Sequence, residues 1–161
     1  MRLLPNYSKC FLCGDKNPKG LNLRFEAREG KVFVRARLDD GTMGFQGLVH
    51  GGIISALLDE TMGWAATVVK RQFCLCAELS VRFVEPLPVG ALVVVTGQMT
   101  RDRGRVWETE GDLCDEHGCV YARARGKYMP MSDVASREVD GYLSYPEGQE
   151  SVLEGPGDES G

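Results

Sequence analysis

One long apolar run limits the folds open to this chain. Residues 51–69, "GGIISALLDETMGWAATVV", are too long for an ordinary strand and predict a helix. The run is apolar almost all round, so packing a single face of it on a flat sheet would leave too much apolar surface in water. A strongly curved antiparallel sheet that wraps the helix would bury that surface.

Strand patterns flank the helix on both sides. Residues 21–38 alternate apolar and polar around Glu29-Gly30, which predicts a hairpin. Four more strand patterns, each bounded by turn residues, follow the helix at residues 73–86, 90–101, 105–114 and 119–129. The order β-β-α-β-β-β-β predicts an α+β protein of the hotdog fold, with one long central helix wrapped by a curved antiparallel sheet of about six strands.

The chain divides into three parts by composition. Its 161 residues fit one domain. We expect an N-terminal segment with a CxxC motif at 1–20, the hotdog domain at 21–129, and a disordered tail at 130–161, which is rich in Gly, Pro, Glu and Ser. The tail holds eight acidic residues and one basic residue, Arg137, so its net charge is −7. Because the whole chain has a net charge of −4, residues 1–129 carry +3. Such a mildly basic body suits an anionic small molecule and is too weakly charged for nucleic acid.

Neither a membrane span nor a secretory signal is visible in the sequence. No run approaches the roughly 18 apolar residues of a span, and the N-terminus lacks an apolar core of signal-peptide length. We therefore expect a cytoplasmic protein.

The six cysteines do not predict a disulfide framework. Cys10 and Cys13 in "CFLCG" could form half of a zinc site, but a second pair at similar spacing is missing, since Cys74 and Cys76 are one residue apart. Reduced structural thiols are the favoured interpretation. We assign no metal ligand and no cofactor, and leave open whether Cys10 and Cys13 bind metal.

The triplet His50-Gly51-Gly52 opens the predicted helix, although glycine is a poor helix former. In one interpretation the glycines permit unusual dihedrals or close packing. In the other, the first free N–H groups of the helix, at the positive end of its dipole, bind an oxyanion or a polarised carbonyl. Glycine would then let a substrate approach the backbone.

Asp59 favours the second interpretation and a dimer. It follows His50 by nine residues, which places it roughly 180° around the helix and ~13 Å along it. The two residues cannot meet on one helix, so a shared site needs Asp59 from a second copy, across antiparallel helices at a twofold axis. Glu60 lies about 100° further round. We expect it to face elsewhere and to be structural.

At this point a family resemblance becomes specific. The stretches "FQGLVHGGIISALLDETMGW" and "AELSVRFVEPLPVG" resemble the PaaI-like hotdog acyl-CoA thioesterases, and "CFLCGDKNPKGLNLRF" resembles the N-terminal segment of one branch of that family. The resemblance covers residues 10–129. It implies a homodimer or dimer of dimers that hydrolyses a small or medium acyl-CoA to the free acid and CoA without a cofactor.

The resemblance also implies roles for individual residues. The Gly51 N–H, next to Gly52, would bind the thioester carbonyl. Asp59 of the partner subunit would activate water or attack the carbonyl itself. His50 would orient the loop or form a hydrogen bond near the thioester, rather than act as a base. Gln46, in the loop before the triplet, would touch the carbonyl or the water, unless it only caps backbone groups.

One position departs from the family pattern. Relatives often carry Thr or Ser on the strand after the helix to hold the attacking water, and alignment puts Cys76 there. A thiol is a weak hydrogen-bond partner. Either Cys76 substitutes, or Ser80 or a water does so, or the protein is a non-catalytic acyl-CoA-binding module, which is the alternative function. Cys76 is not favoured as a nucleophile, because no basic group is placed to lower its pKa.

Basic residues could hold the phosphates of CoA. We favour Arg101 and Arg103 in the hairpin "RDRGR"; the other candidates are Lys70, Arg71, Arg82 and Arg105. Trp64 and Met62 could line an acyl pocket or be plain core. A hydratase of the same fold is disfavoured, because those enzymes commonly set an Asp and a His on one short motif that is absent here.

Overall fold

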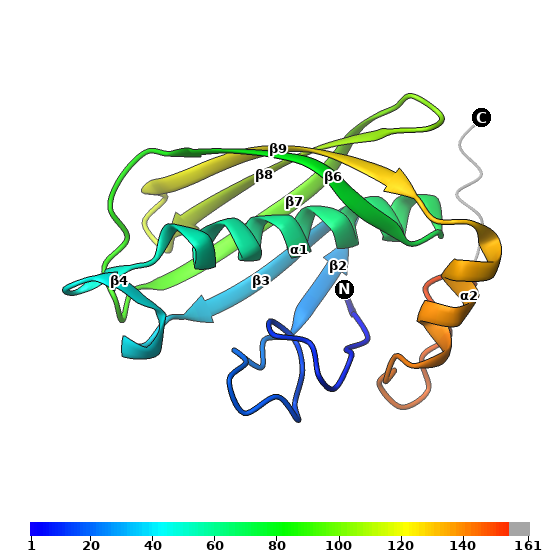
Figure 1. Cartoon of the computed structure of the whole chain (residues 1–161), viewed down its shortest axis with the longest axis horizontal. Coiled ribbons are helices and arrows are strands. Elements are labelled where there is room, and N and C mark those ends of the chain that lie inside the picture. Colours follow the sequence, from blue (N-terminus) through cyan, green and yellow to red (C-terminus); the bar gives the residue numbers. More distant parts are fainter. Residues whose placement is uncertain (155–161) are drawn as a thin grey trace.

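A computed structural model describes residues 1–154 of the chain (Figure 1). The predicted helix is α1, Gly51–Lys70. It begins after His50 and ends at Arg71, whose left-handed backbone (φ 52°) stops the helical turn. Within residues 1–154, no helix combines the length and apolar character that a membrane crossing requires.

A seven-stranded antiparallel sheet lies against α1 (Figure 1). Its strands are β1 (Arg2–Leu3), β2 (Phe25–Arg28), β3 (Lys31–Arg37), β6 (Cys74–Phe83), β7 (Leu92–Asp102), β8 (Trp107–Asp115) and β9 (Val120–Pro130). Their spatial order is β1-β2-β3-β7-β8-β9-β6. The predicted hotdog architecture is confirmed, with the two-residue β1 added to the six expected strands.

The core forms between α1 and the inner face of the sheet. Leu57, Leu58 and Met62 of α1 are fully buried, as are Val93 and Val95 of β7. The helix lies very close to the centre of the sheet at Gly97, where a Cβ atom would stand 2.7 Å from the Thr61 carbonyl oxygen. Glycine is therefore required at this contact.

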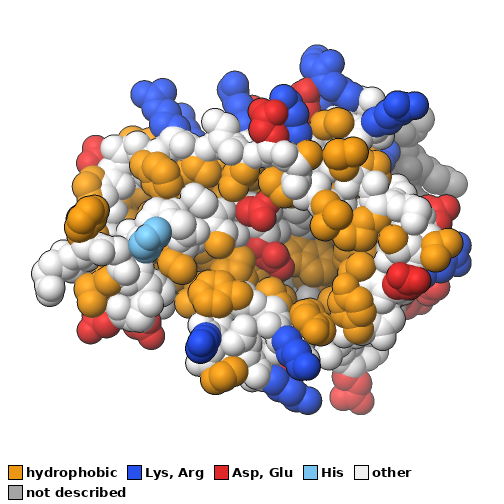
Figure 2. All heavy atoms as spheres, viewed as in Figure 1, with side chains coloured by type: hydrophobic (Ala, Val, Ile, Leu, Met, Phe, Trp, Pro, Cys, Tyr) orange, Lys and Arg blue, Asp and Glu red, His pale blue; other side chains and the backbone are white. Residues whose placement is uncertain are grey.

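The sheet does not wrap α1 completely within one chain. A stripe at helical spacing on the side away from the sheet stays partly or fully exposed: Gly52, Ser55, Ala56, Asp59, Glu60 and Gly63. Figure 2 shows this side of the molecule, where acidic side chains lie among hydrophobic ones in the middle of the face. The central helix thus keeps one side available, near its two carboxylates.

The segment between β3 and α1 carries more structure than expected. It forms a short 3-10 helix, Asp40–Thr42, and a two-stranded ladder of β4 (Met43–Phe45) and β5 (Leu48–Val49). This ladder leads directly into the start of α1 (Figure 1).

The expectation of a disordered tail from residue 130 is wrong for residues 130–154. Helix α2 (Asp133–Gly141) follows the N-cap residue Ser132, whose side chain accepts a hydrogen bond from the Ala135 N–H. The chain then returns to pair Ser144 with Asn6 of the N-terminal segment and buries Val152. Most of its acidic residues are exposed, but Asp140 is half-buried and accepts hydrogen bonds from the hydroxyls of Tyr145 and Ser151. Residues 155–161 lie outside the described part of the chain.

Candidate active site

Asp59 is held in place by a tyrosine of the sheet. The Tyr128 hydroxyl, on β9, donates to the Asp59 carboxylate Oδ1 at 2.8 Å and also lies 2.9 Å from its carbonyl oxygen. Tyr128 is 2% exposed, so this hydroxyl is fixed by packing. Proximity to Asp59 and burial raise the pKa of Tyr128, with burial the larger cause, so the phenol stays a proton donor. The carboxylate is thereby oriented at the rim of a cavity.

Cys76 lies directly beside this pair. On β6 it is the register partner of Tyr128. Burial and the neighbouring Asp59 carboxylate raise the pKa of Cys76 to about 11. The thiol is therefore protonated at neutral pH, which argues against a nucleophilic role.

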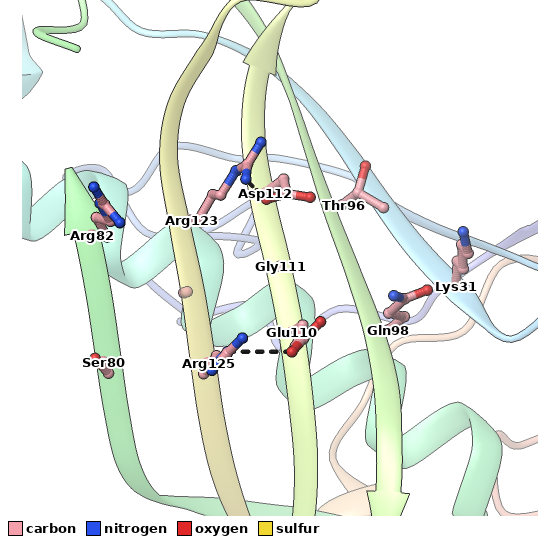
Figure 3. A pocket seen from close by; sticks show the side chains of 11 residues that line it. Lys31, Ser80, Arg82, Thr96, Gln98, Glu110, Gly111, Asp112, Arg123 and Arg125 are labelled. Carbon is pink, nitrogen blue, oxygen red and sulfur yellow. Dashed lines mark ion pairs between the residues drawn. The ribbon is translucent and has the colours of Figure 1, made fainter. Parts of the chain in front are cut away.

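Ser80 cannot take the water-holding role within this chain. A bulge between Cys76 and Glu78 shifts the register of β6. Ser80 then lies on the face of the sheet away from α1, in a polar hollow of about 640 Å³ (Figure 3). Arg82 lines the same hollow, where the ion pair Arg125–Glu110 spans 3.3 Å. The sheet thus separates this hollow from Asp59.

The start of α1 has the geometry of a hydrogen-bond donor site. His50 is the N-cap, and its Nδ1 accepts the Gly52 N–H at 2.8 Å. The backbone N–H of His50 donates to the Thr42 carbonyl oxygen at 2.8 Å. Within residues 1–154 no acceptor is recorded for the Gly51 N–H. His50 thus orders the turn and occupies the Gly52 N–H, which leaves Gly51 as the donor.

Close packing surrounds Gly51. A Cβ atom there would lie 3.2 Å from the ring of Phe83, at the end of β6. Gln46 lies nearby in sequence, exposed in the turn between β4 and β5. Glycine at this position therefore allows the close packing of the first interpretation, and binding of a substrate carbonyl by its N–H stays a prediction.

Gly51 and Asp59 do not form one site within a single chain. They are eight residues apart on α1, which corresponds to about 12 Å along the helix axis. Asp59 instead faces a cavity of about 340 Å³ at the other half of the helix. That cavity is lined by Tyr7, Cys10, Cys13, Asp59, Glu60, Gly63, Trp64, Thr67, Phe73, Cys74, Leu75, Cys76, Tyr128, Met131, Val139, Tyr142 and Leu143.

The cavity walls are largely aromatic and apolar. The rings of Trp64 and Phe73 meet edge to face with centroids 5.9 Å apart. Met62, in contrast, is fully buried in the core and is absent from the lining. Val139, Tyr142 and Leu143 come from α2 and the segment after it. Sequence reasoning missed this wall, because it assigned these residues to the tail.

Glu60 lines the same cavity as Asp59, which corrects the expectation that it faces elsewhere. Both carboxylates lie on the half-exposed side of α1, because one helical step of about 100° does not take Glu60 out of a wide cavity. Burial raises the pKa of Glu60 to about 7. Its carboxylate Oε1 accepts a hydrogen bond from Trp64 Nε1 at 3.2 Å.

The CxxC motif forms part of the cavity wall. A hydrogen bond from the Cys13 thiol, together with backbone N–H groups, lowers the pKa of Cys10, while the same contact and burial raise the pKa of Cys13. These thiols also lie beside the Glu60 carboxylate of α1, a proximity that the sequence did not show.

The arginines proposed for phosphate binding lie at the opposite end of the fold from Gly51. Arg103 pairs with Glu108 within the β7–β8 hairpin. Lys70, at the end of α1, pairs with Asp102 of that hairpin at 2.6 Å. Neither Arg101 nor Arg103 lines the Asp59 cavity. Their assignment to phosphates stays a prediction.

Comparison with known sequences supports the family. Residues 46–122 match the family model described as thioesterase superfamily. Over 62 residues, 38% of this chain, the sequence is 34% identical to acyl-coenzyme A thioesterase THEM4 of Mus musculus. The homologue from Rattus norvegicus matches to the same extent. The matched region spans about a quarter of these curated relatives, 26% of their length.

Solved structures support the fold. A crystal structure of a thioesterase superfamily protein superposes with a TM-score of 0.71 at 27% identity, covering 76% of this chain and 60% of that one. The PaaI protein of the E. coli phenylacetic acid degradation operon gives a TM-score of 0.63 at 17% identity, over 70% and 81%. A Streptococcus mutans UA159 protein bound to acetyl CoA gives 0.63 at 17%, over 68% and 89%. This chain therefore has the hotdog fold of these solved structures, and its residues 46–122 are similar to the thioesterase superfamily.

Proposed function

We propose that this protein is an acyl-CoA thioesterase that works as a homodimer, with each active site shared between two chains. The observation that carries the proposal is the separation on α1 of two complementary groups. The Gly51 N–H lacks an acceptor within residues 1–154, and the Asp59 carboxylate is oriented by Tyr128. Hydrolysis of a thioester needs both groups at one carbonyl. The acyl-coenzyme A thioesterase activity in the name of the THEM4 relatives supports this reaction class.

The exposed edge of β6 supports the dimer. β6 is the terminal strand of the sheet, and its ten residues leave one row of backbone N–H and C=O groups without a strand partner in residues 1–154. Leu75, Phe83 and Val84 are 63%, 53% and 46% exposed on or beside it. Antiparallel pairing of two β6 strands about a twofold axis would cover these side chains and set the two α1 helices antiparallel.

In the proposed reaction, the thioester oxygen accepts the Gly51 N–H of one subunit. Asp59 of the other subunit takes a proton from water, and the hydroxide attacks the carbonyl carbon. The C–S bond then breaks, the CoA thiolate takes up a proton, and the acid leaves. In an alternative mechanism, the Asp59 carboxylate attacks the thioester carbonyl directly, and water hydrolyses the resulting anhydride. Arg101 and Arg103 are our candidates for the CoA phosphates.

An acyl-CoA-binding module without turnover is the second candidate function. Its support is Cys76, a protonated thiol in place of the hydroxyl that relatives use to hold water. Such a protein would bind CoA thioesters in the same cavity and release them unchanged.

Release of free CoA thiol distinguishes the two functions. The purified protein is incubated with short, medium, long and aromatic acyl-CoAs, and thiol is measured by a colorimetric reagent. We expect turnover of small, medium or aromatic acyl groups, because a cavity of about 340 Å³ is at the small end of ligand pockets. If no thioester is cleaved while CoA thioesters raise the melting temperature, the binding module replaces the thioesterase.

The segment after α2 should determine which acyl chain lengths the protein prefers. Leu143→Ala removes a side chain from the cavity wall and should shift the ratio of kcat/KM toward longer acyl chains by about tenfold. Val134→Ala is the matched control, since Val134 lies on α2, is 69% exposed and does not line the cavity. An unchanged chain-length profile in Leu143→Ala would show that the acyl group lies elsewhere.

A further inference from the structure

The fold brings a third metal ligand to the CxxC motif. The Sγ atoms of Cys10 and Cys13 and a carboxylate oxygen of Glu60 all lie within 4.8 Å of one another. Two of these residues belong to the N-terminal segment and the third to the middle of α1, about fifty positions later in the chain. The spacing of cysteines in the sequence shows only the first two. The tertiary structure therefore changes the interpretation of these thiols.

The turn that holds the two thiols is built to stabilise a thiolate at Cys10. The backbone N–H groups of Leu12 and Cys13 both donate to Cys10 Sγ at 3.3 Å. Gly14 is required by this tight turn, because a Cβ atom there would lie 2.4 Å from the Cys10 carbonyl oxygen. The backbone of the turn thus fixes the position of the Cys10 sulfur.

Further contacts fix the other cysteine. The Cys13 carbonyl oxygen accepts from Arg24 Nη1 at 2.8 Å and from Asn6 Nδ2 at 3.3 Å. Such outer contacts orient metal ligands in proteins. They engage the backbone and leave the Cys13 thiol free to face Cys10 and Glu60.

Within the described residues, the carboxylate of Glu60 has no cationic partner. Its hydrogen bond comes from the neutral Trp64 Nε1, and no Lys or Arg in residues 1–154 forms an ion pair with it. Asp59 adds a further negative group beside it in the same cavity. A partly buried cluster of two thiols and one carboxylate, with a second carboxylate in the same cavity, is electrostatically suited to a divalent cation.

We propose that Cys10, Cys13 and Glu60 bind a zinc ion, which would tie the N-terminal segment to α1 at the wall of the Asp59 cavity. Two sulfur ligands favour Zn²⁺ over Mg²⁺ or Ca²⁺, which prefer oxygen. Binding displaces the thiol protons, which leave to solvent as the Zn–S bonds form. Three protein ligands of a tetrahedral ion leave one position for water on the cavity side. The proposal does not depend on thioester hydrolysis.

Cobalt substitution tests the site without an activity assay. Metal-stripped protein is reduced and titrated with Co²⁺, and thiolate-to-cobalt charge-transfer absorption is recorded before competition with Zn²⁺. We expect one Co²⁺ per chain, displaced by one Zn²⁺. The double variant Cys10→Ser/Cys13→Ser should lose the absorption. Glu60→Gln, which is close in shape and keeps an acceptor for Trp64, should weaken Zn²⁺ affinity by more than about tenfold, because even outer contacts of metal ligands change affinity about 10–100-fold.

The matched control is Cys114→Ser/Cys119→Ser. These thiols lie at the β8–β9 turn and outside the cluster, so metal uptake should equal that of the wild type. Absence of cobalt absorption in the reduced wild type would overturn the proposal. So would absorption that survives in Cys10→Ser/Cys13→Ser, or Zn²⁺ affinity unchanged in Glu60→Gln. In another outcome, the intact mass of the protein before reduction is two hydrogens below that of the reduced chain, and the reduced protein takes up no metal. This result would identify a redox-active cysteine pair instead.

Discussion

Asp59→Asn should lower kcat for the best acyl-CoA substrate by about 10³-fold. The amide keeps an acceptor for the Tyr128 hydroxyl, which donates to Asp59 Oδ1 at 2.8 Å, so the local packing is preserved. It cannot take a proton from water or attack a carbonyl. Steady-state release of CoA thiol measures the loss, and analytical ultracentrifugation checks that the dimer persists.

The matched control for this variant is Asp112→Asn. Asp112 is exposed on the far side of the sheet, where it pairs with Arg123 at 3.5 Å. Its replacement removes the same charge without touching the proposed site, and kcat should stay within about twofold of wild type, as surface substitutions have small effects. Turnover of Asp59→Asn within a few fold of the wild type would exclude Asp59 as base or nucleophile.

Hydrophobic periodicity was sufficient to predict the main elements of the fold. The helix expected at 51–69 spans Gly51–Lys70, and the last strand expected at 119–129 spans Val120–Pro130. These segments are long, and their apolar patterns match the faces that they bury. Local pattern and tertiary packing agree there, so the sequence alone is informative.

Helix α2 could not be predicted from composition, because its packing depends on very few buried side chains. Ser136 is 2% exposed and accepts the Phe73 N–H at 3.2 Å, while Val139 faces the Asp59 cavity. The surrounding acidic residues dominate any average over the tail. Ser132 was the one local signal, since serine before Asp133 is typical of a helix N-cap.

The residues of the candidate site also divide into those that the sequence could predict and those that it could not. Gly51 and Asp59 could be singled out because a glycine in a helix and a charge in an apolar run each conflict with local preference. Tyr128 could not, because it fits its strand pattern, and only the register of β9 beside β6 places it at Asp59. The contact of Glu60 with the CxxC motif likewise depends on how an irregular N-terminal segment folds back on α1.

Gly51→Pro should lower kcat by about 10²–10³-fold, the typical cost of removing one oxyanion donor. Proline deletes the N–H of Gly51 yet is favoured at the first position of a helix. The preceding residue suits it, since His50 has an extended backbone with φ −63° and ψ 132°. The variant therefore removes the donor while the helix start is kept. Thiol release and circular dichroism measure the two effects.

Gly51→Ala separates the hydrogen bond from the space around it. Alanine retains the N–H, and its Cβ meets the same Phe83 ring, 3.2 Å away, that the proline would meet. Phe83 is 53% exposed, so its ring can move aside in both variants. We expect a much smaller loss for alanine than for proline. Equal losses would mean that close approach of the substrate, and not the N–H, is what Gly51 provides.

Mixing the two inactive chains tests the shared site itself. In a heterodimer of Asp59→Asn and Gly51→Pro, one site receives the intact Gly51 of the first chain and the intact Asp59 of the second. The other site carries both changes. Random exchange of subunits makes half of the dimers mixed, so about a quarter of wild-type activity should return. Sites built within one chain would give no recovery, because every chain would contain one defect. Recovery would therefore show directly that the Gly51 N–H and the Asp59 carboxylate of one reaction centre come from different subunits.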